Sequence, residues 1–275
     1  RPGGAGIQTA GLITGGSTGA PWVFYTNTET YNGTAWTEVN DLNTGRGLKN
    51  GAGTQTAALI AGGFSYDLSP NFSALTEKYD GTSWTEAGDL TTPRGMNGGN
   101  GTQTAALNSG GEGTPGSLNV SEEWDGTSWS EGNNLNTGRG QTAGSGTQTD
   151  GLVISGVAPP AINAVESYNG TCYSAVANIG TGRYCGGTTS GAASSGSLFF
   201  AGRPPTSGTA LTESWDGSTW TEVADQATAT NQPGSFGTTI LAVRAAGNTS
   251  PSATTATSEE WTVPQPIETK TFTAT

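Results

Sequence analysis

Residues 46–93 read RGLKNGAGTQTAALIAGGFSYDLSPNFSALTEKYDGTSWTEAGDLTTP, and this order of motifs recurs along the chain. An arginine begins most copies, and a threonine takes its place in a more divergent sixth copy: Arg1, Arg46, Arg94, Arg139, Arg183 and Thr230. Successive starts are 45, 48, 45, 44 and 47 residues apart. A period of this length is typical of an array of identical supersecondary units, so the repeat predicts the architecture.

Each copy contains four segments with the character of β-strands. The Gly-rich stretch 48–53 predicts a short inner strand, and the apolar run 57–61 predicts a strand buried on both faces that ends at Gly62-Gly63. Residues 75–79 alternate in polarity as a third strand does, and Trp84 begins an outer strand. Between them, Asp80-Gly81 predicts a two-residue type I′ turn with positive φ at both central positions.

Four antiparallel strands per unit, repeated radially, make a β-propeller blade. We therefore expect an all-β, six-bladed β-propeller with essentially no helix, formed as one domain by residues 1–275. The expected blades are approximately 1–45, 46–93, 94–138, 139–182, 183–229 and 230–275.

The sixth copy departs most from the pattern. We expect residues 236–245 to supply its buried strand and residues 257–261 its third strand. Residues 262–266 replace the hairpin turn, and residues 269–274 are expected to form a closing outer strand. The ring is expected to close through contacts between the first and last blades.

Composition disfavours several functions. A net charge of −12 with only 10 Lys and Arg residues makes nucleic-acid or anionic-membrane binding unfavourable. No apolar run approaches the roughly 20 residues that a membrane helix needs, so membrane insertion is not expected. Because only 12% of the residues are charged, the surface should be rich in amide, hydroxyl and backbone groups, which suits an extracellular or virion-exposed setting.

The chain contains no histidine, no phosphate-binding loop and no clustered cysteines. These absences remove Ser-His and Cys-His nucleophiles and the usual metal ligands, so we expect no catalytic residues, metal or cofactor. Cys172 and Cys185 fall on different predicted strands and should be free thiols. The first residue is Arg1 rather than methionine and no signal peptide is visible, so we expect a processed product or a piece of a longer protein.

The order of apolar strand, Gly-Gly, Glu-x-Tyr, Trp and the next arginine resembles the Kelch motif. The glycine pair is complete in three copies and weaker in three others: Gly15-Gly16, Gly62-Gly63 and Gly110-Gly111, then Ser155-Gly156, Ala201-Gly202 and Ala246-Gly247. The resemblance covers the whole chain and implies a Kelch-like six-bladed propeller. The sequence departs from the Kelch motif at two points. The spacing from Tyr79 to Trp84 is short, and Tyr173 stands where a Trp is expected.

The recurring Gly-Thr-Gln-Thr-Ala phrase also resembles Kelch-type repeat proteins of marine bacteriophages. This second likeness implies a virion appendage or surface component rather than a cellular enzyme. Fold analogy alone does not define a function, so the candidate sites are taken from the residues themselves.

The anchor arginines are the first candidate site. They should lie near the axis on one face, where a ring of guanidinium groups could bind a carboxylate or sulfate: Arg46, Arg94, Arg139 and Arg183. The alternative, which we favour because Thr230 interrupts the ring, is pairing inside the scaffold with upstream polar residues: Asp41, Asp89, Asn134, Asn178 or Asp225.

Two other sets of repeated residues have structural interpretations. A glutamate recurs on every predicted third strand and should tie a blade to a neighbouring loop: Glu29, Glu77, Glu122, Glu166, Glu213 and Glu259. Aromatic residues flank each hairpin and should pack between blades: Tyr31, Tyr79, Trp124, Tyr168, Trp215 and Trp261, with Trp36, Trp84, Trp129, Tyr173 and Trp220.

Aromatic residues outside the repeat form the second candidate site. Six of them lie in the variable loops between second and third strands of the first two copies: Trp22, Phe24, Tyr25, Phe64, Tyr66 and Phe72. Flat rings stack on the apolar faces of sugars, so these positions are candidate ligand-binding residues. The alternative is that they pack within their own loops.

These features lead to three functional hypotheses. The first is a non-enzymatic surface interaction module, such as a phage decoration or adhesion protein, that binds cell-surface glycan or protein through loops on one face. Sequence variation is concentrated in those loops: 17–28, 64–73, 112–118 and 203–208. The second is an architectural subunit that packs against other virion or surface proteins. The third is a sialidase-like glycosidase, which would need several arginines, an acid and a tyrosine in one cleft.

Overall fold

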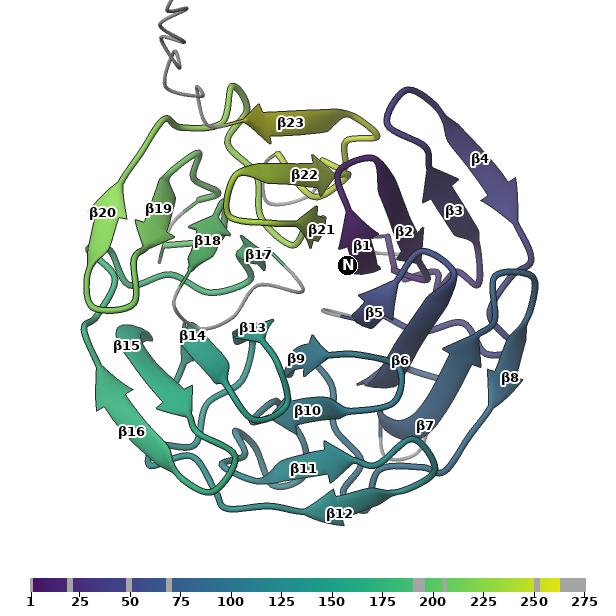
Figure 1. The fold of residues 1–275 in the computed structure, drawn as a ribbon, viewed down its shortest axis with the longest axis horizontal. Coiled ribbons are helices and arrows are strands. Elements are labelled where there is room, and N and C mark those ends of the chain that lie inside the picture. Colours follow the sequence, from purple (N-terminus) through teal and green to yellow (C-terminus); the bar gives the residue numbers. More distant parts are fainter. Residues whose placement is uncertain are drawn as a thin grey trace, which may run out of the picture.

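The chain folds into a ring of six antiparallel sheets arranged around a central axis (Figure 1). The computed structural model describes residues 2–18, 22–47, 51–67, 71–189, 196–204, 207–249 and 253–262. Throughout these ranges the secondary structure is β-strand, and no α-helix occurs. The predicted all-β, six-bladed β-propeller is therefore confirmed.

The first three blades each contain four strands. They are β1 (Gly3–Ile7), β2 (Ala10–Thr14), β3 (Thr28–Tyr31) and β4 (Trp36–Val39); β5 (Ala52–Thr54), β6 (Ala57–Phe64), β7 (Phe72–Tyr79) and β8 (Trp84–Glu86); and β9 (Gly98–Gly101), β10 (Ala106–Ser109), β11 (Ser121–Trp124) and β12 (Trp129–Glu131).

The remaining blades follow the same order. They are β13 (Ala143–Gly146), β14 (Gly151–Val157), β15 (Ala161–Tyr168) and β16 (Tyr173–Val176); β17 (Gly187–Thr188), β18 (Ser197–Phe200), β19 (Thr212–Trp215) and β20 (Trp220–Glu222); and β21 (Gly234–Gly237), β22 (Leu241–Ala245) and β23 (Ser258–Thr262). The segment 236–245, predicted as one buried strand, is divided between β21 and β22. The outer strand predicted at 269–274 lies outside the described residues.

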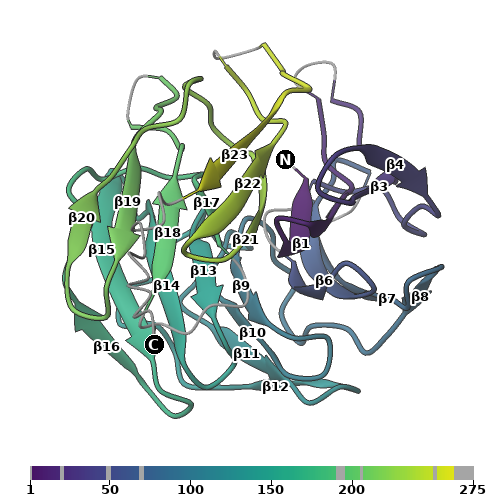
Figure 2. The same ribbon diagram turned by 45° about the horizontal axis from the view of Figure 1, so that its top comes forward.

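Strand direction defines two faces of the ring, which Figure 2 shows from a tilted view. In every blade the first strand starts, and the second strand ends, on the same face. This loop face therefore carries the loops between second and third strands and the crossings into the next blade. The opposite face carries the turns between first and second strands and the outer hairpins.

The core lies between adjacent blades, as the repeated aromatics predicted. One buried cluster joins Ala5 and Leu12 of the first blade to Ile60, Tyr79 and Trp84 of the second. The two aromatics of a blade also contact each other across the hairpin, with ring centroids 5.0 Å apart for Tyr79 and Trp84. Each such aromatic removes a large apolar area from water, and the sum over the ring holds neighbouring sheets together.

The outer hairpins differ from the predicted type I′ turn. Gly81 has a φ of 93°, whereas Asp80 is not among the residues with positive φ. The Asp80 carboxylate instead accepts hydrogen bonds from the backbone N–H groups of Thr82 and Ser83, both at 2.8 Å. The type I′ prediction is therefore wrong, because the acid side chain caps the turn and a single left-handed residue is enough to reverse the chain.

The Gly-Gly pair follows the end of the second strand in the first and third blades, as predicted, but lies within the strand in the second blade. β6 continues through Gly62 and Gly63 to Phe64, and its pairing with β7 shifts between Ala61 and Gly63, as at a β-bulge. A Cβ atom on Gly62 would lie 2.5 Å from the backbone oxygen of Arg94, and one on Gly63 would lie 2.8 Å from the Arg46 side chain. Glycine is needed here because two arginine-bearing segments approach its backbone closely.

The ring closes by contact between the first and last blades, as predicted. The Tyr31 hydroxyl donates a 2.7 Å hydrogen bond to Glu260 on β23, and Phe236 packs against Tyr31 and Trp36. In the described part of the chain no strand is exchanged between these blades.

Candidate functional site

The anchor arginines are buried inside their own blades. Arg46, Arg94, Arg139 and Arg183 have no exposed side-chain surface. Each pairs with the third-strand glutamate of the same blade: Arg46 with Glu77 at 2.5 Å, Arg94 with Glu122, Arg139 with Glu166 at 3.0 Å, and Arg183 with Glu213 at 2.5 Å. The prediction that these four arginines form an anion-binding ring is therefore wrong, because each guanidinium group is enclosed and already pairs with a carboxylate.

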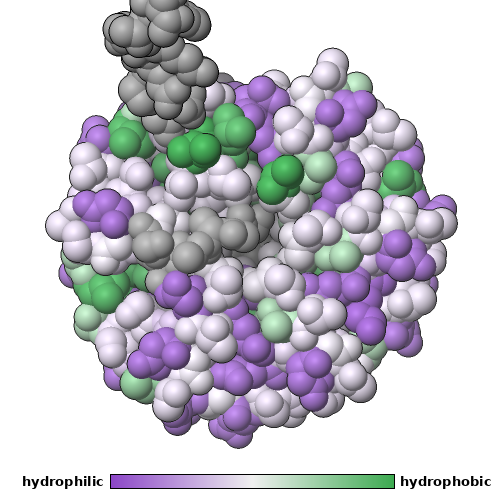
Figure 3. All heavy atoms as spheres, viewed as in Figure 1, coloured by the Kyte–Doolittle hydropathy of each residue, from purple (hydrophilic) through white to green (hydrophobic). Residues whose placement is uncertain are grey.

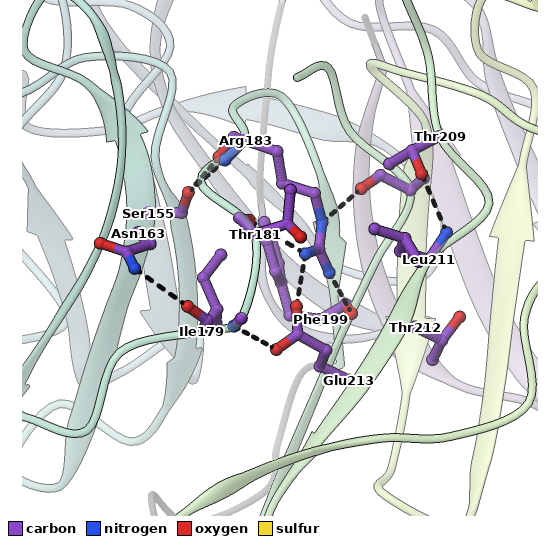
Figure 4. Close-up of polar contacts among 12 residues, drawn as sticks. Ser155, Asn163, Ile179, Thr181, Arg183, Phe199, Thr209, Leu211, Thr212 and Glu213 are labelled. Carbon is purple, nitrogen blue, oxygen red and sulfur yellow. Dashed lines mark hydrogen bonds and ion pairs between the residues drawn. The ribbon is translucent and has the colours of Figure 1, made fainter. Parts of the chain in front are cut away.

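The scaffold interpretation was right about an internal role but wrong about the partner. In the fifth blade, Arg183 donates to the Glu213 carboxylate and to the backbone oxygens of Thr181, Ala201 and Phe199 (Figure 4). The centroid of the Phe199 ring also lies 4.4 Å from the guanidinium carbon of Arg183. Burial lowers the pKa of the Arg183 guanidinium, and the hydrogen bond and charge of Glu213 oppose this effect. Packing, polar contacts and charge thus all direct the arginine inward.

The repeated glutamates join neighbouring units, as predicted. Glu213 accepts a 2.7 Å hydrogen bond from the backbone N–H of Gly180, which belongs to the loop entering the fifth blade (Figure 4). The equivalent N–H donors are Asn43 for Glu77, Thr91 for Glu122, Asn136 for Glu166 and Ala227 for Glu259. One carboxylate therefore fixes both the arginine and the loop that carries it.

The sixth blade keeps this pair although Thr230 stands where an arginine is expected. Arg244 on β22 reaches Glu259 on β23 at 2.7 Å. Sequence reasoning missed this substitution, because Arg244 lies on the second strand of its blade, 14 residues after Thr230, whereas the other arginines precede the first strand. The signal available was an arginine inside an apolar strand, where a charge needs a partner.

The non-repeated aromatics come together on the loop face. Five of the six candidates form a connected cluster, which we call the aromatic cluster: Trp22, Phe24, Phe64, Tyr66 and Phe72. It joins the loops of the first two blades, with Phe24 centred 5.9 Å from Phe64 and Trp22 centred 5.8 Å from Tyr66. Nothing in the repeat pattern indicated that the two loops would meet.

Local backbone pairing explains how the cluster is presented. β6 and β7 have 8 residues each, and their ends place Phe64 directly opposite Phe72. In the first blade a bridge between Ser17 and Phe24 extends the second and third strands in the same direction. Phe24, Phe64 and Phe72 are thus carried on paired backbone, which holds these three rings in place.

Two members of the cluster remain open to solvent. Tyr66 is 52% exposed and Trp22 is 38% exposed, whereas Phe24, Phe64 and Phe72 are half-buried beneath them. The alternative interpretation, in which the aromatic rings only pack within their own loops, therefore applies to Phe24, Phe64 and Phe72 but not to the two exposed rings. Aromatic rings that are held from below and open above can stack on a flat apolar surface of a ligand.

Tyr25 points away from the aromatic cluster. Successive side chains of an extended segment alternate in direction, so Phe24 joins the cluster and Tyr25 lies on the other side. There it lines a separate pocket between the first and last blades and is 41% exposed. The six candidate aromatics therefore belong to two adjoining regions of one face.

The face of the ring drawn in Figure 3 is weakly polar. On the face drawn in Figure 3, hydrophobic residues occur in small separate groups among pale and hydrophilic ones. Within the described ranges, no group of three or more acidic or cysteine side chains could hold a metal ion. The same ranges contain no helix able to cross a membrane. Both cysteines are free, as predicted, and the structure places Cys172 on the surface and Cys185 in the interior.

Comparison of the chain with protein-family models and with curated proteins finds no match. A β-propeller fold is compatible with a protein-interaction module. The Kelch-like character and the phage relationship stay predictions.

Proposed function

We propose that this propeller is a non-enzymatic interaction module of a particle or cell surface, which binds glycan or protein through its loop face. The bacteriophage resemblance extends the proposal to a virion decoration or adhesion protein. One observation carries it: two separate loops assemble the aromatic cluster, with Trp22 and Tyr66 open to solvent.

The charge distribution supports recognition of neutral or weakly polar partners. The chain carries a net charge of −12, and the four anchor arginines are enclosed in their blades with glutamate partners. They are distributed over separate blades rather than gathered in one cleft, so no observation favours the sialidase-like alternative. Binding would then depend on ring stacking and hydrogen bonds rather than on ion pairs.

The test combines Trp22→Ala with Tyr66→Ala. We expect the double variant to fold normally and to lose binding by about tenfold or more on a glycan array or in binding to host cells, because exposed aromatic anchors dominate such contacts. Ile240→Ala is the matched control, since Ile240 is 47% exposed but lies on a turn of the opposite face.

Three outcomes would contradict the proposal. Unchanged binding by the double variant would show that the aromatic cluster is not the binding surface. An intact particle in which Trp22 and Tyr66 are covered by another subunit would favour the architectural role instead. Turnover of fluorogenic sialosides or hexosides by the unmodified protein would show that it is an enzyme.

A further inference from the structure

The boundary between the fifth and sixth blades lacks a side chain that the other boundaries share. In each of the other buried clusters between blades, an aromatic residue of the outer strand packs against the preceding blade: Trp36, Trp84, Trp129, Tyr173 and Trp220. The cluster at this boundary joins Phe200 to Ala242 and Trp261, and no outer-strand ring is among its described members. Each outer ring lies five residues after the third-strand aromatic, and here that position is Pro266.

A pocket of about 340 Å³ lies at this boundary. Phe200 and Thr212 line it from the fifth blade, and Ala242 and Trp261 line it from the sixth. Its volume and its mixture of aromatic, aliphatic and polar side chains are those of a site for a small group rather than of a packing defect.

The third blade shows what occupies the equivalent place elsewhere in the ring. There Ala106 pairs with Trp124 just as Ala242 pairs with Trp261 in the sixth blade. The Trp129 ring completes the cluster that contains Ala106 and Trp124. The pocket therefore corresponds to the place of an outer-strand aromatic ring.

The residue before the third-strand glutamate indicates which kind of ring suits this place. At two boundaries an indole N–H donates to a threonine of the preceding blade at 3.0 Å: Trp84 to Thr28, and Trp129 to Thr76. The fourth blade has Val165 at this position, and the Trp220 N–H across that boundary has no described partner. Because Thr212 restores the hydroxyl in the fifth blade, a ring with an N–H donor matches the pocket better than a phenyl ring.

The strand beside the pocket can accept a further strand. Among the described residues β23 pairs with β22 alone, and it is the outermost arrow of its blade in Figure 1. Exposed strand edges bind extended peptides through backbone hydrogen bonds. The pocket lining carries three carboxylates, Asp225, Glu259 and Glu260, but one guanidinium group, Arg244. Cationic residues in the added segment would complement this charge.

We propose that this pocket and the edge of β23 bind an extended segment of a partner protein that presents a tryptophan flanked by lysine or arginine. The indole ring fills the place of the outer-strand aromatic and donates to Thr212, while the segment pairs with β23. Residues 263–275 contain neither Trp nor Tyr, so the sequence after β23 does not carry the donor ring. The proposal goes beyond the proposed function, because it concerns a surface separate from the aromatic cluster.

The experiment is titration calorimetry of the full chain with the peptide acetyl-Lys-Thr-Trp-Thr-Lys-amide. We expect saturable binding, and at least tenfold weaker binding when alanine replaces the peptide tryptophan, because a buried aromatic anchor dominates such contacts. The benzothiophene analogue of tryptophan keeps the shape of the ring but lacks the N–H group. It should bind about fivefold more weakly, since the hydrogen bond to Thr212 is lost.

Thr212→Val separates the hydrogen bond from the packing of the ring. The fold already accommodates a valine at the equivalent position, Val165, in the fourth blade. The variant should bind the tryptophan peptide and its benzothiophene analogue equally well. Trp22→Ala with Tyr66→Ala is the control on the other surface and should bind the peptide as the unmodified protein does.

Four results would overturn the proposal. The first is no saturable binding of the peptide, and the second is equal affinity for the alanine peptide. The third is binding that appears only after Phe272→Ala, which would assign the pocket to this chain's own residues after β23. The fourth is self-association in sedimentation that the peptide disperses, which would assign the pocket to a second copy. None of these results bears on binding by the aromatic cluster, which the double variant tests separately.

Discussion

In the second to fifth blades a buried arginine pairs with a buried glutamate, and in the sixth the buried Arg244 pairs with the partly exposed Glu259. Removing a charge from water costs several kcal/mol, and additional hydrogen bonds to both members of a buried pair offset that cost. In the fifth blade the backbone oxygens around Arg183 and the Gly180 N–H at Glu213 provide these bonds. The described arginines that begin a repeat therefore each organise their own blade rather than a shared site: Arg46, Arg94, Arg139 and Arg183.

Arg183→Met should destabilise the protein by about 3–5 kcal/mol, because it leaves the Glu213 carboxylate buried without its charge partner. Urea denaturation of the variant measures this loss. Arg244→Met is the comparison, since its partner Glu259 keeps 22% of its side-chain surface exposed and can be rehydrated. We expect Arg244→Met to lower the free energy of unfolding clearly less than Arg183→Met does. Equal decreases would show that burial of the glutamate does not determine the cost.

At the scale of the element, a glutamine explains the recurring Gly-Thr-Gln-Thr motif. The Gln103 side chain lies on a turn between first and second strands and donates to the backbone oxygens of Ala58 and Tyr79 in the preceding blade, at 3.1 and 2.6 Å. Gln55 and Gln148 make the equivalent bonds at their own boundaries. The motif therefore links neighbouring sheets as well as turning the chain.

Gln103→Ala should cost about 1–3 kcal/mol, because two backbone oxygens between blades lose their amide donor. The free energy of unfolding from urea titration is the measurement. Gln8 provides the matched control, since it occupies the same place in the first repeat but its side-chain nitrogen has no partner among the described residues. Gln8→Ala should lower the free energy of unfolding by less. An equal decrease in the two variants would show that the Gln103 hydrogen bonds between blades do not stabilise the fold.

At the scale of the whole molecule, tyrosine hydroxyls connect blades around the ring. Tyr31 bonds to Glu260 across the closing boundary, Tyr168 bonds to Glu123, and Tyr173 lies 2.6 Å from the Ser109 hydroxyl. The hydrogen bond to Glu260 raises the pKa of Tyr31, and burial raises the pKa of Tyr168 and Tyr173. The neutral phenol is therefore the form that the closed ring stabilises.

The fold should consequently lose stability at alkaline pH. A tyrosine whose folded pKa is raised contributes fully below the unfolded value of about 10, and the contribution is lost as the pH rises through the folded pKa. Urea midpoints measured from pH 8 to pH 11 should fall, and Tyr168→Phe should make the decline less steep. An unchanged slope in this variant would exclude Tyr168 as a cause.

The repeat was sufficient to predict the six blades, the antiparallel order of their strands and the aromatic core. These features follow from local periodicity, in which each unit shows the same strands and buries the same faces against its neighbours. The glutamates were correctly assigned as joints between units. The fold could be predicted because its information is repeated in every copy.

Tertiary structure alone decided which side chains pair and which surfaces are open. Arg46 lies 31 residues from Glu77, and Arg244 replaces Thr230 from another strand. The aromatic cluster and the Tyr25 pocket depend on contacts between loops that differ from copy to copy. Periodicity specifies what every blade shares, whereas the candidate sites lie where blades differ, and only packing in three dimensions brings those residues together.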